Sequence, residues 1–138
     1  MQQMSARAEY ALLAVLDLAR HSSEDDPSSV GQVAERTGAP RKYLVEILQQ
    51  LKKNFIVASR RGRYGGYYLK RPAHHISAAQ VLDAVEPEPV QEPDAEASPD
   101  DDVVRWAWRR AEKARMQVLS DVSIAALLQR SQAGDEAV

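Results

Sequence analysis

Hydrophobic residues recur at helical spacing along most of this chain. Between positions 44 and 51 they fall at i, i+3, i+4 and i+7, which predicts the apolar stripe of an amphipathic helix. The stripe consists of Leu44, Ile47, Leu48 and Leu51. Burial of this stripe would turn the other side of the helix outward, and that side carries Arg41, Lys42, Val45, Glu46 and Gln49.

Two further helices are predicted before this basic one. Ser5 is suited to cap a helix that continues to about residue 21. Arg7 lies in its first turn, where the helix dipole disfavours a cation, so an external anion is a candidate partner beside plain solvation. Ser29 and Gln32 have the spacing of a capping box, and Gly38 can end that second helix in the left-handed conformation. The short spacing to the basic helix predicts a helix-turn-helix.

A glycine-tipped hairpin is predicted directly after the basic helix. Residues 56–59 and 67–70 alternate as β-strands do. At the start of the preceding basic helix, Pro40 suits the first helical turn. In winged-helix proteins the second helix of the pair enters the major groove, and such a hairpin, the wing, lies over the adjacent backbone or minor groove. Glycines allow a tight turn close to sugar and phosphate, and arginine suits a narrow minor groove. The candidate contacts of the hairpin are Arg60, Arg61, Gly62, Arg63, Tyr64, Gly65 and Gly66.

The second half of the chain predicts a connecting loop and a long helix. Ser77 and Gln80 form another capping box, which opens a helix that ends near residue 86. Residues 87–102 are rich in proline and acids, so we expect a mobile loop there. A helix over 103–119 follows, and its stripe could pack on the domain or, as we favour, on a second subunit. The stripe residues assigned to dimerisation are Val104, Trp108, Ala111 and Val118. A short last helix to about residue 130 should give way to a frayed end over 132–138.

Positive charge is concentrated in one part of the chain. The whole chain carries a net charge of −2, whereas residues 36–75 hold ten Lys or Arg and one acid, a net of +9. Residues 1–75 sum to +5 and residues 76–138 to −7. This distribution is typical of a surface that binds a phosphate backbone, although charges that merely solvate exposed faces are the plain alternative. On double-stranded DNA, Gln49 can pair with adenine and Arg41 with guanine, while Lys42 suits a phosphate.

Several classes of function lack the residues that they need. The sequence has no cysteine, which removes disulfides, thiolate metal sites and ordinary iron–sulfur ligation. His74 and His75 are adjacent and have no cluster of acids beside them, so we expect no metal site. No nucleotide-binding loop or catalytic constellation is evident, so an enzyme is not expected. No apolar run reaches the roughly 18–20 residues that span a bilayer, and no signal peptide is apparent, so we expect a cytoplasmic protein without membrane contact.

Five segments together resemble the Rrf-two family of winged-helix transcription regulators, a bacterial family that includes the iron–sulfur cluster regulator and the nitric-oxide-sensing repressor. They are AEYALLAVLDLA, VAERTG, KYLVEIL, RGRYGGYYL and ISAAQVLDAVE. The resemblance covers Met4 to about Leu128 and implies a DNA-binding regulator. One member of the family represses cysteine metabolism through a protein partner. The resemblance therefore leaves a regulatory protein or a small-molecule effector as the switch. A constitutive regulator without an effector is the remaining possibility.

The chain departs from this family where sensing members hold their cluster. Those members place three cysteines in the loop after the AVE segment, and some add a histidine just before a tryptophan of the long helix. Here there is no cysteine, and Arg105 stands three residues before Trp108. The resemblance therefore transfers no cluster ligand, and we expect no cofactor. Val45 stands where many members carry a glutamate implicated in choosing the DNA site, so the operator should differ.

These features predict a mostly α fold with a small β-hairpin, in which a winged helix-turn-helix precedes a long C-terminal dimerisation helix. We expect a DNA-binding domain over residues 1–86, the acidic loop over 87–102 and a dimerisation region over 103–138. The predicted function is a homodimeric, cluster-free transcription regulator, most simply a repressor, which binds an operator with dyad symmetry. The alternative is a winged-helix interaction module whose basic stretch docks an acidic partner protein.

Overall fold

Most helices begin where the sequence supplies a side-chain cap. The computed structural model describes residues 4–86 and 98–136. Ser5 caps α1 by accepting from the Ala8 backbone N–H, and both predicted capping boxes, at Ser29 and Ser77, are formed. The elements of the described residues are α1 (Ala6–His21), α2 (Val30–Thr37), α3 (Arg41–Lys53), β1 (Val57–Arg60), β2 (Gly66–Leu69), the short 3-10 helix η1 (Ala73–His75), α4 (Ala78–Val85), α5 (Pro99–Ser120) and α6 (Ile124–Glu136).

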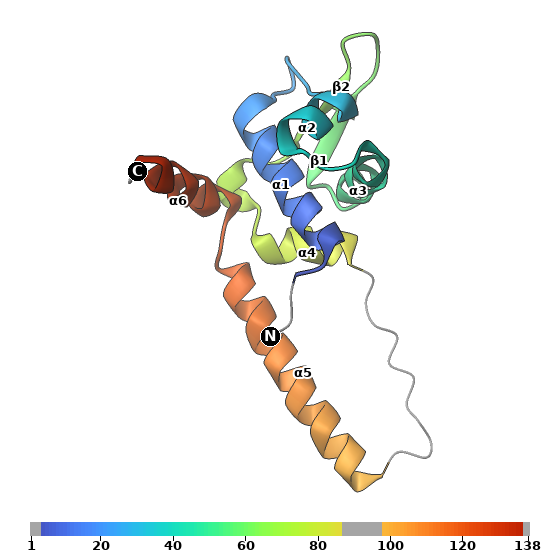
Figure 1. Cartoon of the computed structure of the whole chain (residues 1–138), viewed down its shortest axis with the longest axis vertical. Helices are drawn as coiled ribbons and strands as arrows, with labels where there is room; N and C mark the ends of the chain where they lie inside the picture. Colours follow the sequence, from blue (N-terminus) through green and yellow to red (C-terminus); the bar gives the residue numbers. More distant parts are fainter. Residues whose placement is uncertain (1–3, 87–97, 137–138) are drawn as a thin grey trace.

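The predicted fold class is confirmed. The chain is mostly helical, and β1 and β2 form one antiparallel hairpin in which Val57 pairs with Leu69 and Arg60 with Gly66. The strands lie one residue away from the predicted ranges, at 57–60 and 66–69. Helix α1 lies at the centre of the domain, where α2, α3 and α4 pack around it (Figure 1).

One apolar core joins these elements. The predicted stripe of α3 is fully buried, and it meets Val15 and Leu18 of α1 and Val33 of α2. Ile124 at the start of α6 is also fully buried, so the last helix contributes to the same core. Backbone bonds fix the chain just before α6, because Ala78 donates to the Val122 carbonyl and Ile124 donates to the Ile76 carbonyl, each over 2.8 Å.

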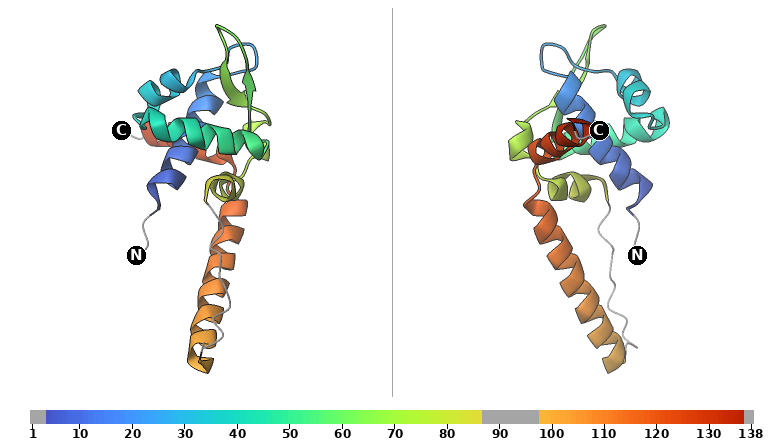
Figure 2. Two further views of the ribbon diagram at one scale, coloured as in Figure 1. Left: turned by 90° about the vertical axis from the view of Figure 1, so that its right-hand side faces the viewer. Right: turned by 60° about the vertical axis from the view of Figure 1, so that its left-hand side comes forward.

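Helix α5 extends away from the domain, at the end opposite the hairpin (Figures 1 and 2). It begins at Pro99, four residues earlier than predicted, because Ser98 and Asp101 form a capping box and the acids of the first turn suit the helix dipole. The first part of the predicted acidic loop, residues 87–97, lies outside the described residues. At the other end, α6 continues to Glu136, so the predicted frayed end is wrong over 132–136.

None of the α5 side chains is buried in the single chain. The intermediate positions are Arg105, Glu112, Met116 and Leu119, which recur at helical spacing along one side of α5. Over residues 4–86 and 98–136, no helix combines the length and the apolar character needed to span a bilayer.

Candidate nucleic-acid interface

The outward side of α3 carries the side chains that its amphipathic pattern predicts. Arg41, Lys42, Val45 and Gln49 are all exposed, and we call these four residues the reading face. The opposite side of the helix is completely buried, which fixes its rotation about its own axis. Tyr43 is also half exposed, and its ring lies 6.0 Å from that of Tyr10. The prediction missed Tyr43, although its place outside the apolar stripe could have shown that it faces outward.

The turn before α3 is built as predicted at Gly38 and slightly differently at Pro40. Gly38 has a φ of 76° and its N–H bonds to the Ala34 carbonyl over 2.9 Å, which closes α2. Pro40 is the residue before the helix rather than a member of its first turn. Its backbone is extended, so α3 starts in a new direction. Ala39 between them is buried and joins the turn to the core.

A buried ion pair that sequence inspection missed holds α2 against α1. The Asp17 side chain is 7% exposed, and its two carboxylate oxygens accept from Nε and Nη2 of Arg36 over 3.0 and 2.9 Å. Nη2 of Arg36 also donates to the buried Ser28 hydroxyl over 2.6 Å. Arg36 belongs to the basic stretch, but its guanidinium is paired with Asp17 and its side chain is only 29% exposed. The lone acid among apolar residues in LAVLDLA was the signal for this pair.

The hairpin presents three arginines around a turn. We call Val57–Leu69 the wing, and Arg61–Gly65 the wing tip. Arg61, Arg63 and Tyr64 are exposed at the tip, and Tyr64 is the most open aromatic side chain at 80%. The Arg63 guanidinium lies 5.8 Å from the Tyr64 ring. Arg60 points back instead, within 3.4 and 3.5 Å of the backbone carbonyls of Glu24 and Asp25.

Two wing glycines are required by contacts inside the protein. A Cβ on Gly65 would overlap the Arg60 carbonyl oxygen, and a Cβ on Gly66 would overlap the Ser28 backbone. Strand β2 approaches that backbone because Ser28 and Tyr67 exchange two backbone hydrogen bonds of 2.9 and 2.7 Å. Gly62 has a φ of 115°, which side-chain-bearing residues rarely adopt. The predicted approach of these glycines to DNA stays a prediction, since the fold alone explains them.

Helix α3 and the wing are neighbours in the domain. Figure 2 (left) shows the α3 ribbon with the wing rising above it. Lys52 near the end of α3 donates to the Ser59 hydroxyl of β1 over 2.6 Å, which ties the helix to the wing. Chemically, α3 and the wing together offer exposed guanidinium and ammonium groups, one amide and an exposed aromatic ring.

Ser5 and Arg7, also predicted as contacts, have partners within the chain. The Ser5 hydroxyl caps α1 and donates to Glu86 over 2.9 Å. Nη2 of Arg7 donates to Glu46 over 2.8 Å and to Gln50 over 2.7 Å, so it crosses from α1 to α3. A phosphate would compete with these bonds, and contact of Ser5 and Arg7 with DNA stays a prediction.

Comparisons with known proteins give the family of the chain. A profile of the Rrf2 family, which is described as an iron-dependent transcriptional regulator, matches residues 4–130. The chain belongs to the Rrf2 family. The transcriptional regulator IscR of Pectobacterium carotovorum is 38% identical over 84 residues, or 61% of this chain and 51% of that protein. IscR of Xenorhabdus nematophila is 39% identical over 84 residues, with the same coverage. The chain therefore spans about half the length of these curated relatives.

Solved structures of Rrf2 regulators share the fold along nearly the whole chain. IscR of T. potens has a TM-score of 0.75 at 27% identity, covering 94% of this chain and 88% of that one. CymR, the global cysteine regulator of B. subtilis, has a TM-score of 0.73 at 26% identity, covering 94% and 98%. This Rrf2 chain is a winged-helix protein, and its relatives are transcriptional regulators.

The donor set of this Rrf2 chain does not fit an iron–sulfur cluster. Such clusters are held by cysteine thiolates, and the sequence contains none. Among residues 4–86 and 98–136, no group of three or more His, Cys, Asp or Glu side chains is placed to hold a metal ion. His74 and His75 lie against each other, with ring centroids 4.1 Å apart.

Proposed function

We propose that this protein is a DNA-binding transcription regulator that sets α3 in the major groove and the wing on the neighbouring backbone or minor groove. The observation that carries the proposal is that α3 and the wing are neighbours (Figure 2) and that both carry exposed basic side chains. Gln49 and Arg41 would contact base edges, while Lys42, Arg61 and Arg63 would bind phosphates. Membership of the Rrf2 family and its regulator relatives support this assignment.

We further propose that the regulator works as a homodimer formed through α5. The predicted dimerisation stripe is open in the single chain, where Val104, Trp108 and Val118 are 68%, 53% and 64% exposed. Ala111, between them on the stripe, is exposed too. Exposed apolar side chains in this number on one extended helix are costly in water, and a second copy would cover them. Two copies would place two reading helices on half-sites about one helical turn apart.

Switching of this regulator would not use an iron–sulfur cluster. The missing thiolates support this inference, because no other residue type in the chain replaces them as ordinary cluster ligands. We propose a repressor in the cytoplasm that blocks promoters by occupying them, under the control of a protein partner or a small molecule.

Selection of promoter fragments tests the proposal. Purified full chain is incubated with fragments of its own genome's promoters at about 150 mM salt, where non-specific electrostatic binding is weak. Recovery of a few fragments that share a dyad is the expected result. Unselective recovery, or none with an extract of the source cells added, would refute a sequence-specific regulator and favour the interaction module that docks an acidic protein.

The salt dependence of operator binding then tests the role of the wing. The binding constant falls as salt concentration rises, and removing one phosphate contact makes the slope of log K against log salt concentration shallower by roughly 0.9. Arg61→Ala should show this decrease, together with weaker binding at every salt concentration. Arg130→Ala on α6 is the matched control, since it removes the same charge from an exposed position outside the interface. Equal losses in the two variants would show that the wing arginine acts only through net charge.

A further inference from the structure

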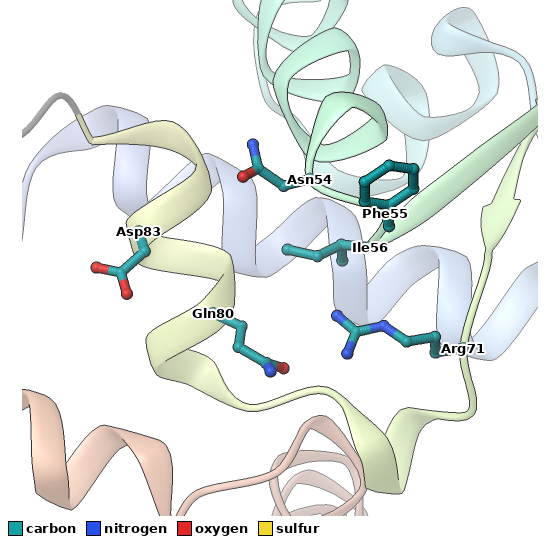
Figure 3. A pocket seen from close by; sticks show the side chains of 6 residues that line it. All are labelled: Asn54, Phe55, Ile56, Arg71, Gln80 and Asp83. Atoms are coloured by element: carbon teal, nitrogen blue, oxygen red, sulfur yellow. The ribbon is translucent and has the colours of Figure 1, made fainter.

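A shallow pocket of about 400 Å³ lies between the turn that follows α3 and helix α4 (Figure 3). Its walls are formed by Asn54, Phe55, Ile56, Arg71, Gln80 and Asp83. None of these residues belongs to the reading face or the wing tip. The pocket is therefore separate from the surface assigned to DNA, although it touches the base of the same helix.

Arg71 points its guanidinium into this pocket with unused hydrogen-bonding capacity (Figure 3). Its Nε is buried and has no hydrogen-bond partner. Nη1 reaches the His75 backbone carbonyl over a long 3.4 Å, and within the described residues the guanidinium forms no ion pair. Nε of Arg7 is likewise unpartnered, but Arg7 is held by Glu46 and Gln50. Because Nε is covered by protein, a ligand in the pocket would meet the two Nη groups, and a guanidinium can bind a carboxylate through such N–H bonds.

Phe55 supplies an apolar wall in a strained conformation. It is the one non-glycine residue with a positive φ in the described parts of the chain, at 60°, and its side chain is 63% exposed. A bulky residue in that conformation is disfavoured, and such strain gathers at ligand sites. The Lys70 ammonium lies 4.9 Å from the ring centroid, so the ring is held beside a second positive charge. Ile56 is buried and continues this apolar wall.

We propose that this pocket binds a small organic monocarboxylate with an aromatic or similarly flat apolar body. The carboxylate would pair with Arg71, and the apolar body would lie against Phe55. The amides of Asn54 and Gln80 at the rim can donate to or accept from polar substituents. The carboxylate of Asp83 lies at the far rim from Arg71 and disfavours a second negative charge on the ligand (Figure 3). The site goes beyond the proposed DNA-binding function and does not depend on it.

Phenylacetate is the probe that tests this site, with phenylacetamide as its uncharged analogue. Binding to the full chain is followed by NMR through the Arg71 Nε–H resonance and the backbone amides around the pocket. Because the pocket is open and the probe small, a Kd on the order of 1 mM is expected. Phenylacetamide should bind at least about tenfold more weakly, since it cannot form the charge-assisted pair.

Arg71→Gln should weaken phenylacetate binding at least about tenfold, whereas Arg130→Gln, the same charge change on α6, should leave it unchanged. Phe55→Gly separates an effect on binding from an effect on folding. It removes the apolar wall that the ligand would contact, and it relieves the strained φ, so the fold should not be destabilised. That variant should bind phenylacetate several-fold more weakly while melting no lower than the parent protein. The proposal is overturned if phenylacetamide binds as well as phenylacetate, if the two arginine variants bind alike, or if no saturable shift appears by about 10 mM.

Discussion

Gly66→Ala isolates the contact that holds the wing to the rest of the domain. Gly66 does not have a positive φ, so alanine suits its backbone conformation and the substitution acts through space alone. The added Cβ would overlap the carbonyl carbon and oxygen of Ser28 and lie 2.8 Å from the Ser29 nitrogen. All three obstacles are backbone atoms, which cannot rotate away as a side chain can. Strand β2 must therefore move off the segment before α2.

The cost of that movement follows from the bonds it breaks. Ser28 and Tyr67 exchange two backbone hydrogen bonds, of 2.9 and 2.7 Å, and each contributes about 1 kcal/mol net. Ser28 is 2% exposed, so its freed groups are poorly reached by water, which adds roughly 1–3 kcal/mol. Alanine lowers the entropy of the unfolded chain and returns about 0.5 kcal/mol. We expect a loss in unfolding free energy of about 2.5–4.5 kcal/mol.

Urea unfolding followed by far-ultraviolet circular dichroism measures this loss. Both tryptophans lie exposed on α5, so their fluorescence would report on that helix rather than on the wing. The protein concentration must be held fixed, because the proposed dimer would contribute to apparent stability. Gly31→Ala is the control, since the nearest atoms to its added Cβ lie at 3.9 Å. Gly31 is inside α2, so this change should stabilise by up to about 1 kcal/mol.

The reasoning fails if Gly66→Ala is as stable as the parent protein or behaves like Gly31→Ala. Either result would mean that β2 does not approach the Ser28 backbone as closely as described, and that the wing is held by the hairpin alone. With the expected loss, operator affinity should also fall, because the wing tip moves with β2 while the reading face on α3 stays in place.

Three other predictions concern single side chains. Phe55→Gly should raise the unfolding free energy by about 1 kcal/mol in urea titrations, because it relieves the left-handed conformation of an exposed residue; a lower midpoint would mean that the ring stabilises the fold. Asp17→Ala should cost about 3 kcal/mol, since it leaves a part-buried arginine unpaired, whereas Glu46→Ala, which opens a surface pair, should cost under about 1 kcal/mol. NMR titration should find the pKa of Asp101 below its usual range, because hydrogen bonds from the Ser98 backbone and hydroxyl favour the carboxylate. The support that it gives to the start of α5 should be present above the ordinary aspartate pKa and be lost as pH falls through the lowered value; an ordinary pKa would show that the capping box does not form.

Local chemistry allowed much of this protein to be predicted from its sequence. The buried stripe of α3, the caps at Ser5, Ser29 and Ser77, and the left-handed Gly38 all depend on residues within one or two helical turns. Periodicity and hydrogen-bonding capacity are sufficient for such features, because the interacting groups are close in sequence. The same periodicity placed the reading face outward, since a helix that buries one stripe must expose the opposite one.

Tertiary structure decided the features that depend on distant partners. The sequence places Arg36 in a basic stretch, but the fold brings Asp17 to it from another helix and pairs the two charges. Gly66 is required by the backbone of Ser28, and the φ of Phe55 is set by the turn between α3 and β1. Which side chains meet across a core depends on how the helices pack, and a linear pattern carries no information on that packing. The ion pair, the wing contact and the Arg71 pocket therefore became visible only in three dimensions.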